Sequence, residues 1–297
     1  MSADTLKVGR REVRVPHPDK LLFADPPIDK LALARHYERV GGAMVPLVRD
    51  RPLALQSFPD GIEGKGFFMK SVPKYFPGWI RTATVPKKGG TLTQVLGDDA
   101  ATFVYLAGQN VITPHAWLSR ADEPHIPDRL IIDFDPSPGV RFAEIRAAAR
   151  DAGERLRDLG LATYAMVTGS RGIHVLCPLR RGPDFTVVHG FARALAERMV
   201  ADDPRNLTLE WHRDERGKRI YIDVNRIAYA QHAVAPYAVR PRPRGPVAMP
   251  IVWEELSDRS LRPDRWTIRT AADRLESDGD AWAGIARHAR RLPAIPD

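Results

Sequence analysis

Two aspartates follow directly on an apolar run in the segment LIIDFDPSPG, and this segment constrains the fold more than any other. Residues 130–132 predict a buried strand, which the prolines from Pro136 onward end. Side chains i and i+2 of a strand project from the same face, so Asp133 and Asp135 are expected side by side. Two such carboxylates repel each other, and Mg²⁺ or Mn²⁺ relieves this repulsion by binding their oxygens. The segment therefore predicts a metal site at the end of a strand.

A third acid, Asp223, lies in a second strand-like run, RIYIDVNR. Residues 130–224 read as strand, helix, strand, strand, helix, strand, which is a ferredoxin-like or RNA-recognition-like βαββαβ pattern. In that α+β fold the first and last strands of the motif are neighbours, so Asp133 and Asp223 are expected to meet. Three acids on two neighbouring strands can hold two metal ions for phosphoryl transfer. An Asp-x-Asp pair also occurs in glycosyltransferases that bind nucleotide sugars.

The chain has 297 residues and a net charge of +8, with a pI near 9.8. Such a charge suits a polyanionic partner such as nucleic acid, and it equally suits an arginine-rich but merely solvated surface. The single cysteine, Cys177, excludes an intrachain disulfide and a zinc site of several cysteines, and fits a reducing cytosol. The sequence shows no apolar run long enough to span a membrane and no signal peptide.

The chain is expected to form one domain over residues 1–297. Its expected parts are an N-terminal α/β module of about residues 1–110, a catalytic half of about 111–260 and a helical tail of about 261–297. Asp29 is predicted to cap a helix that ends near Gly41. Other predicted elements are a β-ribbon in the first 20 residues, a helical stretch over 91–110, helices over 141–159 and 184–201, and an extended proline-rich segment over 240–250.

The turn TGSRGIH joins two of the predicted strands. Its glycines let the backbone approach a ligand, and Ser170 and Arg171 can hold phosphate oxygens. The alternative is an ordinary tight hairpin with a basic residue by chance. His174 and, elsewhere, His115 in TPHAWLSR could each be a structural histidine, and Phe67 could stack on a base or pack in the core. Arginines near metal-bound acids would suit a triphosphate.

Together these segments resemble a known family. The chain resembles the polymerase domain of bacterial ligase D, in the archaeo-eukaryotic primase superfamily, over roughly residues 15–260. The matching segments are HPDKLLF, PDGIEGKGFFMK, TPHAWLSRADEP, LIIDFDPSPG, TGSRGIHV, DVNR and APYAVRPRPRGPVAMPIVWEEL. The resemblance implies a primase-polymerase fold with an RNA-recognition-like catalytic half, and a template-dependent nucleotidyltransferase that repairs double-strand breaks by non-homologous end joining.

The resemblance also implies roles for individual residues. It gives the two metal ions, Mn²⁺ or Mg²⁺, to Asp133, Asp135 and Asp223, and it places His115 near the incoming nucleotide. It implies that Phe67 stacks on a base. Residues implied to line or neutralise the triphosphate are Thr168, Ser170, Arg171, His174, Arg216, Arg226 and Arg240. Lys20 and Lys30 match two lysines that hold a downstream 5′-phosphate of DNA, with His17 in the same patch.

The implied substrates are gapped or broken DNA ends and nucleoside triphosphates, with ribonucleotides preferred. The implied partners are Ku and an ATP-dependent DNA ligase, in a bacterial cytoplasm at the nucleoid. The sequence departs from the family pattern at His17, Arg171, Thr168, Ile227 and His232. A primase that starts chains without a primer, and a non-catalytic module that binds DNA ends, remain alternatives.

Overall fold

The computed structural model describes residues 3–294, and the chain divides into two compact units of interleaved segments. Unit 1 consists of residues 1–122, 232–249 and 266–280, and unit 2 of residues 123–231, 250–265 and 281–297. These units differ from the modules that the sequence suggested. Residues 111–122 and 232–249 belong to unit 1, because the strands that they contain pair with a strand of that unit. Of the residues expected to form a helical tail, 266–280 belong to unit 1, whereas 261–265 and the described residues from 281 onward belong to unit 2.

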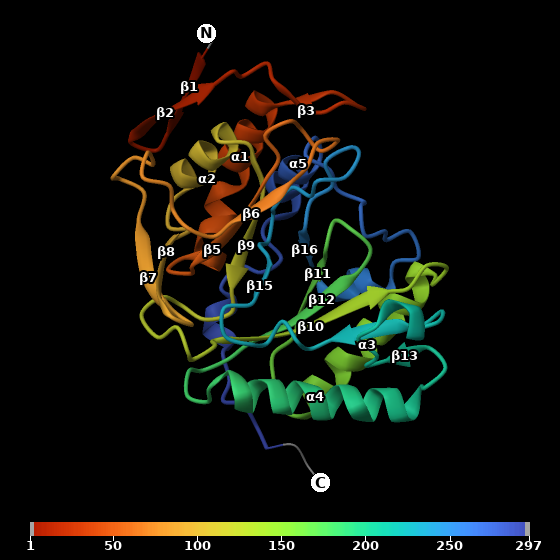
Figure 1. Cartoon of the computed structure of the whole chain (residues 1–297). Helices are drawn as coiled ribbons and strands as arrows, with labels where there is room; N and C mark the ends of the chain where they lie inside the picture. Colours follow the sequence, from red (N-terminus) through yellow and green to blue (C-terminus); the bar gives the residue numbers. More distant parts are fainter. Residues whose placement is uncertain (1–2, 295–297) are drawn as a thin grey trace. The chain divides into compact units, whose positions relative to one another are not determined.

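Unit 1 has a four-stranded sheet in the order β15-β9-β5-β6, with helices α1 and α2 packed against each other (Figure 1). The sheet strands are β15 (His232–Val234), β9 (Val111–Trp117), β5 (Leu53–Ser57) and β6 (Phe67–Met69). The helices are α1 (Lys30–Val48), α2 (Ala100–Gly108) and α5 (Ala271–Asp278). Three antiparallel pairs complete the unit: β1 (Ala3–Val8) with β2 (Arg11–Pro16), β3 (Leu21–Phe23) with β4 (Ile28–Asp29), and β7 (Thr82–Lys87) with β8 (Gly90–Val95). The predicted N-terminal ribbon is therefore confirmed.

Helix α1 begins where the sequence indicated and ends later. The side chain of Asp29 accepts a hydrogen bond from the amide of Ala32 at 2.7 Å, which is the expected cap. The helix does not end at Gly41 but continues to Val48. Gly41 serves packing instead, because a Cβ at this position would lie 2.4 Å from the Cβ of Ala100 in α2. The glycine thus lets the two helices approach each other closely.

The prediction of a helix over residues 91–110 is wrong for the first half of this range. Residues 90–95 form strand β8, and α2 begins only at Ala100, after its cap Asp99. Alternating β-branched residues in TLTQV pair with β7, so the tertiary partner overrides the local impression of a helix.

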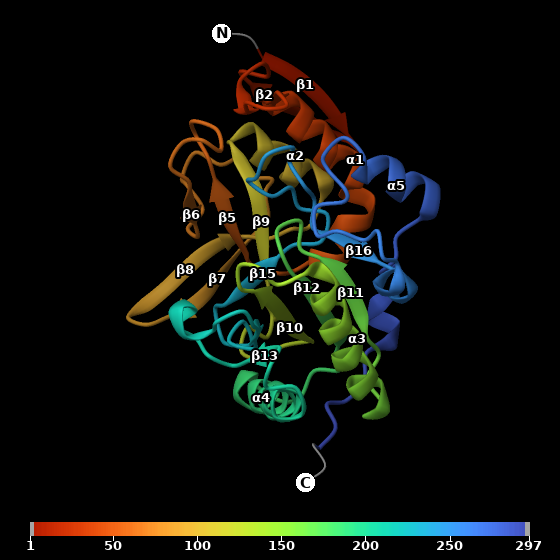
Figure 2. The same cartoon turned by 90° about the vertical axis from the view of Figure 1, so that its right-hand side faces the viewer.

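Unit 2 is built on a six-stranded sheet in the order β13-β14-β10-β12-β11-β16. Its strands are β13 (Leu207–Thr208), β14 (Ile220–Asp223), β10 (Arg129–Pro136), β12 (Ile173–Pro178), β11 (Tyr164–Val167) and β16 (Met249–Ile251). Helices α3 (Phe142–Asp158) and α4 (Phe185–Asp202) cover one face of this sheet (Figures 1 and 2). The short helices η1 (Arg213–Glu215), η2 (Trp253–Ser257) and η3 (Ile285–His288) complete the described elements.

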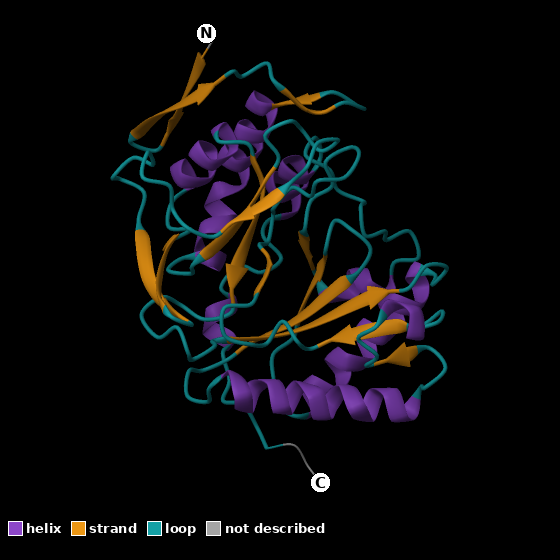
Figure 3. Ribbon diagram, viewed as in Figure 1, coloured by secondary structure: helices purple, strands orange, loops and turns teal. Residues whose placement is uncertain are grey.

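The predicted βαββαβ motif is present as β10-α3-β11-β12-α4-β14, drawn in Figure 3. Its first and last strands, β10 and β14, are antiparallel neighbours, as the topology required. The segment LTLEWHRD contributes strand β13, which pairs in parallel with β14 of RIYIDVNR. The buried thiol of Cys177 lies in β12, and burial raises its pKa.

Candidate active site

Register places the acids of β10 and β14 together. Asp133 lies opposite Asp223 of β14 on one side and opposite His174 of β12 on the other, and Asp135 lies opposite Tyr221. Residues opposite each other on neighbouring strands share a face of the sheet, so all these side chains project from one face. The three acids predicted from sequence are thus brought together.

The opposite face of the same strands is apolar and holds the site in place. Ile132, Phe134 and Ile222 alternate with the acids and are completely buried. Helices α3 and α4 pack against this face, with Ala149 and Ala152 of α3 also completely buried. The alternation of apolar and acidic residues along β10 therefore fixes which side of the sheet the carboxylates occupy.

Each acid contacts an arginine or histidine side chain within unit 2. Asp135 accepts from Arg171 at 3.0 Å through Oδ1 and from Arg216 at 3.3 Å through Oδ2. The other two contacts are His174 Nε2 to Asp133 Oδ1 at 3.4 Å and Arg226 Nε to Asp223 Oδ2 at 3.3 Å. The predicted residues His174, Arg171, Arg216 and Arg226 are therefore all gathered around the acids.

The electrostatic environment of Asp223 disfavours its charged form. Its pKa is raised, first because the carboxylate is buried, and further because Asp133 and Asp135 are close. Arg226 and the amide of Asn225, which donates to Oδ1 at 2.9 Å, act in the opposite direction. The negative charge at Asp223 is thus only partly compensated by the protein.

The donor chemistry at this face fits a divalent cation such as Mg²⁺ or Mn²⁺. Three carboxylates are hard oxygen ligands, and the raised pKa of Asp223 reflects negative charge that a cation would stabilise. Among residues 3–294, no three His, Cys, Asp or Glu side chains are already arranged around one point. At Asp135 both carboxylate oxygens already accept hydrogen bonds from Arg171 and Arg216, which explains why this acid is not arranged around a point with the other two. Metal binding by all three acids requires these arginines to release Asp135.

The turn between β11 and β12 is shaped by two glycines. Gly169 has a φ of +65°, which favours glycine. At Gly172 a Cβ would lie 2.2 Å from the carbonyl oxygen of Phe134 in β10, so only glycine lets the turn approach that strand. The hydroxyl of Thr168 lies 3.1 Å from the carbonyl oxygen of Gly172 and 3.2 Å from its amide nitrogen, and it closes the turn. Ser170, in the same turn, is half-buried.

Arg216 is an anchor for the loop between β13 and β14. Its guanidinium donates to the carbonyl oxygens of Glu210 at 3.0 Å and Trp211 at 2.8 Å, besides its contact with Asp135. It also lies 3.9 Å above the ring of Tyr221. A single buried side chain thus ties this loop to the acidic face of the sheet.

The other predicted nucleotide-binding residues lie in unit 1. His115 on β9 contacts the ring of Phe68 at 5.2 Å and that of His232 on β15 at 5.3 Å. Phe67 and Phe68 are both about half exposed, so of the two alternatives for Phe67, packing in the core is wrong. The family resemblance assigns base stacking to Phe67, whereas it is Phe68 whose ring contacts His115. Arg240 also belongs to unit 1.

The three residues predicted to hold a 5′-phosphate lie together in unit 1. The amide of Lys30 donates to the carbonyl oxygen of Lys20, and the amide of Lys20 to that of His17. His17 is exposed and Lys20 is half-buried, but Lys30 is only 3% exposed, and its Nζ donates to the carbonyl oxygen of Pro16 at 2.9 Å. Burial and, secondly, Lys20 lower the pKa of Lys30. Nothing in the residues around Lys30 indicates that this lysine is buried.

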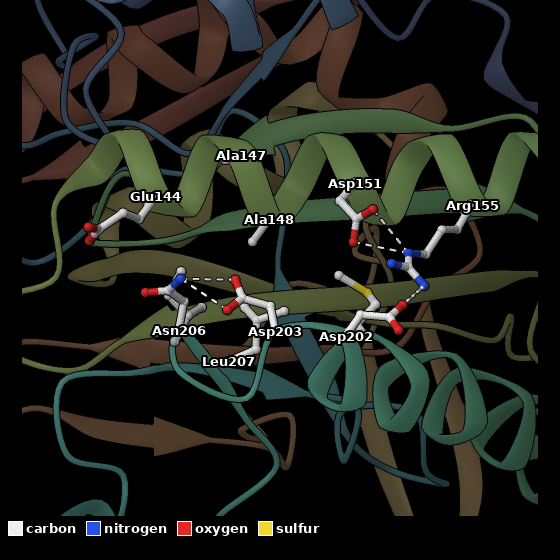
Figure 4. A pocket seen from close by; sticks show the side chains of 11 residues that line it. Glu144, Ala147, Ala148, Asp151, Arg155, Asp202, Asp203, Asn206 and Leu207 are labelled. Carbon is white, nitrogen blue, oxygen red and sulfur yellow. Dashed lines mark hydrogen bonds and ion pairs between the residues drawn. The ribbon is translucent and has the colours of Figure 1, made fainter.

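A pocket of about 340 Å³ lies between α3 and α4, among their side chains and those of β13 and β14 (Figure 4). Four of its lining residues are acidic, and these acids already have partners. Arg155 joins Asp151 and Asp202, and Asn206 donates to Asp203. Ile220, from the apolar face of β14, contributes to the lining. The pocket therefore lies on the helix side of the sheet and is separate from the acidic face.

The chain is similar to a family of known proteins. The model of the LigD primase-polymerase domain family matches residues 29–282. This chain belongs to that family. The LigD polymerase domain of Mycobacterium tuberculosis, solved in complex with DNA, superposes with a TM-score of 0.87 at 26% identity, covering 93% of this chain and 98% of that one. The α+β fold is thus the archaeo-eukaryotic primase-polymerase fold that the sequence indicated.

Longer relatives are the LigD proteins of non-homologous end joining. Those of Mycolicibacterium smegmatis and Pseudomonas aeruginosa are 27% and 29% identical over 92% and 99% of this chain. The chain spans only 36% and 35% of those two proteins. No helix among residues 3–294 is long and apolar enough to cross a membrane.

Proposed function

We propose that this LigD primase-polymerase domain is a DNA-directed nucleotidyltransferase that fills gaps and extends broken ends in non-homologous end joining, with ribonucleotides preferred. One observation carries the proposal. Asp133, Asp135 and Asp223 project from one face of two paired strands, beside a glycine-shaped turn that presents Arg171. The names of the longer relatives, and the DNA bound to the structural neighbour, support the same function.

Mn²⁺ or Mg²⁺ ions held by the three acids would supply charge neutralisation and activation of a primer hydroxyl at the α-phosphate. The protein's own groups bind and orient the substrates. The turn of residues 168–172 accommodates the triphosphate, with Ser170 and Arg171 donating to its oxygens and Thr168 keeping the turn closed. His174 orients the carboxylate of Asp133. Arg226 turns from Asp223 to the added phosphate charge, and Arg216 adds positive charge while its guanidinium still donates to the carbonyl oxygens of Glu210 and Trp211.

The residues of unit 1 complete the proposal. Phe67, or Phe68 beside it, stacks on a base, while His115 and Arg240 contact the incoming nucleotide. Lys20 and His17 bind the downstream 5′-phosphate, and Lys30 positions their loop through Pro16 and Lys20. Ku and an ATP-dependent ligase are proposed partners, at the nucleoid of a bacterial cytoplasm.

The test is extension of a primer across a one-nucleotide gap with a 5′-phosphate, using Mn²⁺ and either ribo- or deoxynucleotides. We expect wild type to extend, more strongly with ribonucleotides, and Asp135→Ala to bind the DNA without extending it, because basic residues supply most of the affinity. Extension by Asp135→Ala would overturn the metal assignment. DNA binding without extension by wild type would favour the end-binding module, and products made without a primer would indicate a primase.

A separate comparison tests the phosphate patch. Lys20→Ala is expected to remove the preference for a 5′-phosphorylated gap over an unphosphorylated one. Lys7→Ala, in β1 of the same unit, is the control of equal charge. A preference that survives in Lys20→Ala would place phosphate recognition elsewhere.

A further inference from the structure

Trp211 is a large apolar side chain that the fold leaves exposed beside the acidic face. It follows β13, precedes η1, and is 59% exposed. Large aromatic rings are usually buried unless they serve recognition. None of the roles proposed above uses this ring.

The position of Trp211 is fixed by its neighbours. Arg216 donates to its carbonyl oxygen at 2.8 Å, and its ring meets the ring of Tyr221 edge-on, with centroids 6.2 Å apart and an angle of 83°. Arg216 in turn lies against Tyr221 and donates to Asp135. The indole is therefore presented to solvent from a held backbone, and a ligand that stacks on it need not order a mobile loop.

Trp211 and the turn of residues 168–172 lie on opposite sides of Asp135. Arg171 of the turn approaches Oδ1 of Asp135, whereas Arg216 approaches Oδ2. The strand order agrees, since β12 with the turn lies on one side of β10, and β14 with Tyr221 lies on the other. In an in-line phosphoryl transfer the attacking and leaving oxygens are on opposite sides of the phosphorus. If the triphosphate lies over the turn, the attacking strand approaches from the side of Trp211.

We propose that Trp211 stacks on a nucleobase of the primer strand near its 3′ end. The inference rests on the proposed function, because the placement of the triphosphate sets the direction of attack. Aromatic rings stack on any base, and neighbouring cations bind the strand's phosphates. The loop from Trp211 to Arg219 carries four arginine and lysine side chains against two acids, and Arg213 and Lys218 are exposed.

The decisive experiment places the fluorescent base 2-aminopurine at the primer 3′ terminus and titrates it with protein in buffer without divalent metal. Wild type and Trp211→Phe are expected to change its fluorescence on binding. Trp211→Ala is expected to lose this change and to bind the primed DNA on the order of tenfold more weakly. Val187→Ala is the control, because this exposed residue lies on α4, on the helix side of the sheet.

Two outcomes would overturn the proposal. One is an unchanged signal in a folded Trp211→Ala, judged by circular dichroism and Tm. The other is a loss seen only when 2-aminopurine is placed in the template strand. In extension assays Trp211→Ala should raise KM for primed DNA but not for the nucleotide, and the opposite pattern would place the incoming base on Trp211. Since the binding assay needs no turnover, absence of extension by wild type would refute the proposed function alone.

Discussion

Asp133 and Asp223 are direct cross-strand partners on β10 and β14, although two α-helices and three strands separate them in the sequence. Their carboxylates share one face of the sheet, and the pKa of Asp223 is raised by burial and by Asp133. The folded state therefore carries an unfavourable charge at neutral pH, and this cost disappears as the pH falls through the raised pKa.

Asp223→Asn is expected to stabilise the metal-free protein at neutral pH while abolishing nucleotide addition. The amide removes the buried charge next to Asp133, so Tm in EDTA should rise above that of wild type. Loss of this proposed metal ligand should reduce extension at least about 100-fold, since even groups behind metal ligands contribute 10- to 100-fold. Mn²⁺ should raise Tm of wild type but not of the variant. A variant less stable than wild type in EDTA would contradict the electrostatic account.

Gly172→Ala is expected to destabilise unit 2. The new Cβ would lie 2.2 Å from the carbonyl oxygen of Phe134, so strands β10 and β12 must separate beside the acids. We expect a loss of about 2 kcal/mol or more in the free energy of unfolding. Gly190→Ala is the control: that position lies in α4 with open space around a Cβ, and it should gain about 0.5–1 kcal/mol. Urea denaturation measures both, and equal effects would refute the prediction.

Arg216→Met is expected to loosen the loop between β13 and β14. The substitution leaves the carbonyl oxygens of Glu210 and Trp211 without their donor and frees Asp135 from one cation. Amide hydrogen exchange over residues 209–219 should become at least about tenfold faster, which corresponds to about 1.4 kcal/mol of local stability. Arg213→Met, an exposed neighbour, should leave exchange unchanged. The same protection in both variants would show that the loop does not depend on Arg216.

His36 makes the stability of unit 1 depend on pH. It is 3% exposed in α1, its Nε2 lies 2.9 Å from the carbonyl oxygen of Tyr237, and burial lowers its pKa to about 4. As the pH falls below about 6.5, His36 therefore takes up a proton in the unfolded chain but not in the folded chain. Stability from this group is full above pH 6.5 and falls by up to about 3 kcal/mol as the pH drops to 4.

The measurement is urea denaturation between pH 4 and pH 8 for wild type and His36→Gln, whose amide can still donate to Tyr237. The variant should show a shallower loss of stability below pH 6.5. Identical slopes would mean that other groups cause the acid sensitivity.

The sequence was most informative where one local pattern determined the structure. The alternation of apolar and acidic residues along LIIDFDP determined which face of β10 carries the acids. The βαββαβ order required β10 and β14 to be neighbours, so the proximity of Asp133 and Asp223 was predictable. Asp29 likewise showed where α1 begins.

Features that depend on distant partners were not predictable. Whether Gly41 ends a helix or lets it pack depends on Ala100, which the local sequence does not contain. The burial of Lys30 and the contact between Phe68 and His115 arise in the same way, from segments that meet only after folding. The pairing of Asp135 with two arginines is a property of the loops around it rather than of its own motif.

The interleaving of the two units has a consequence for synthesis on the ribosome. β15 belongs to the sheet of unit 1 but is translated only after residues 123–231, the first segment of unit 2, and residues 266–280 of unit 1 follow later still. Folding must therefore await almost the whole chain, and many contacts join residues far apart in sequence, which slows folding. A fragment that stops at residue 122 or at residue 231 would leave both units unfinished, so neither half can be expected to fold as a continuous piece.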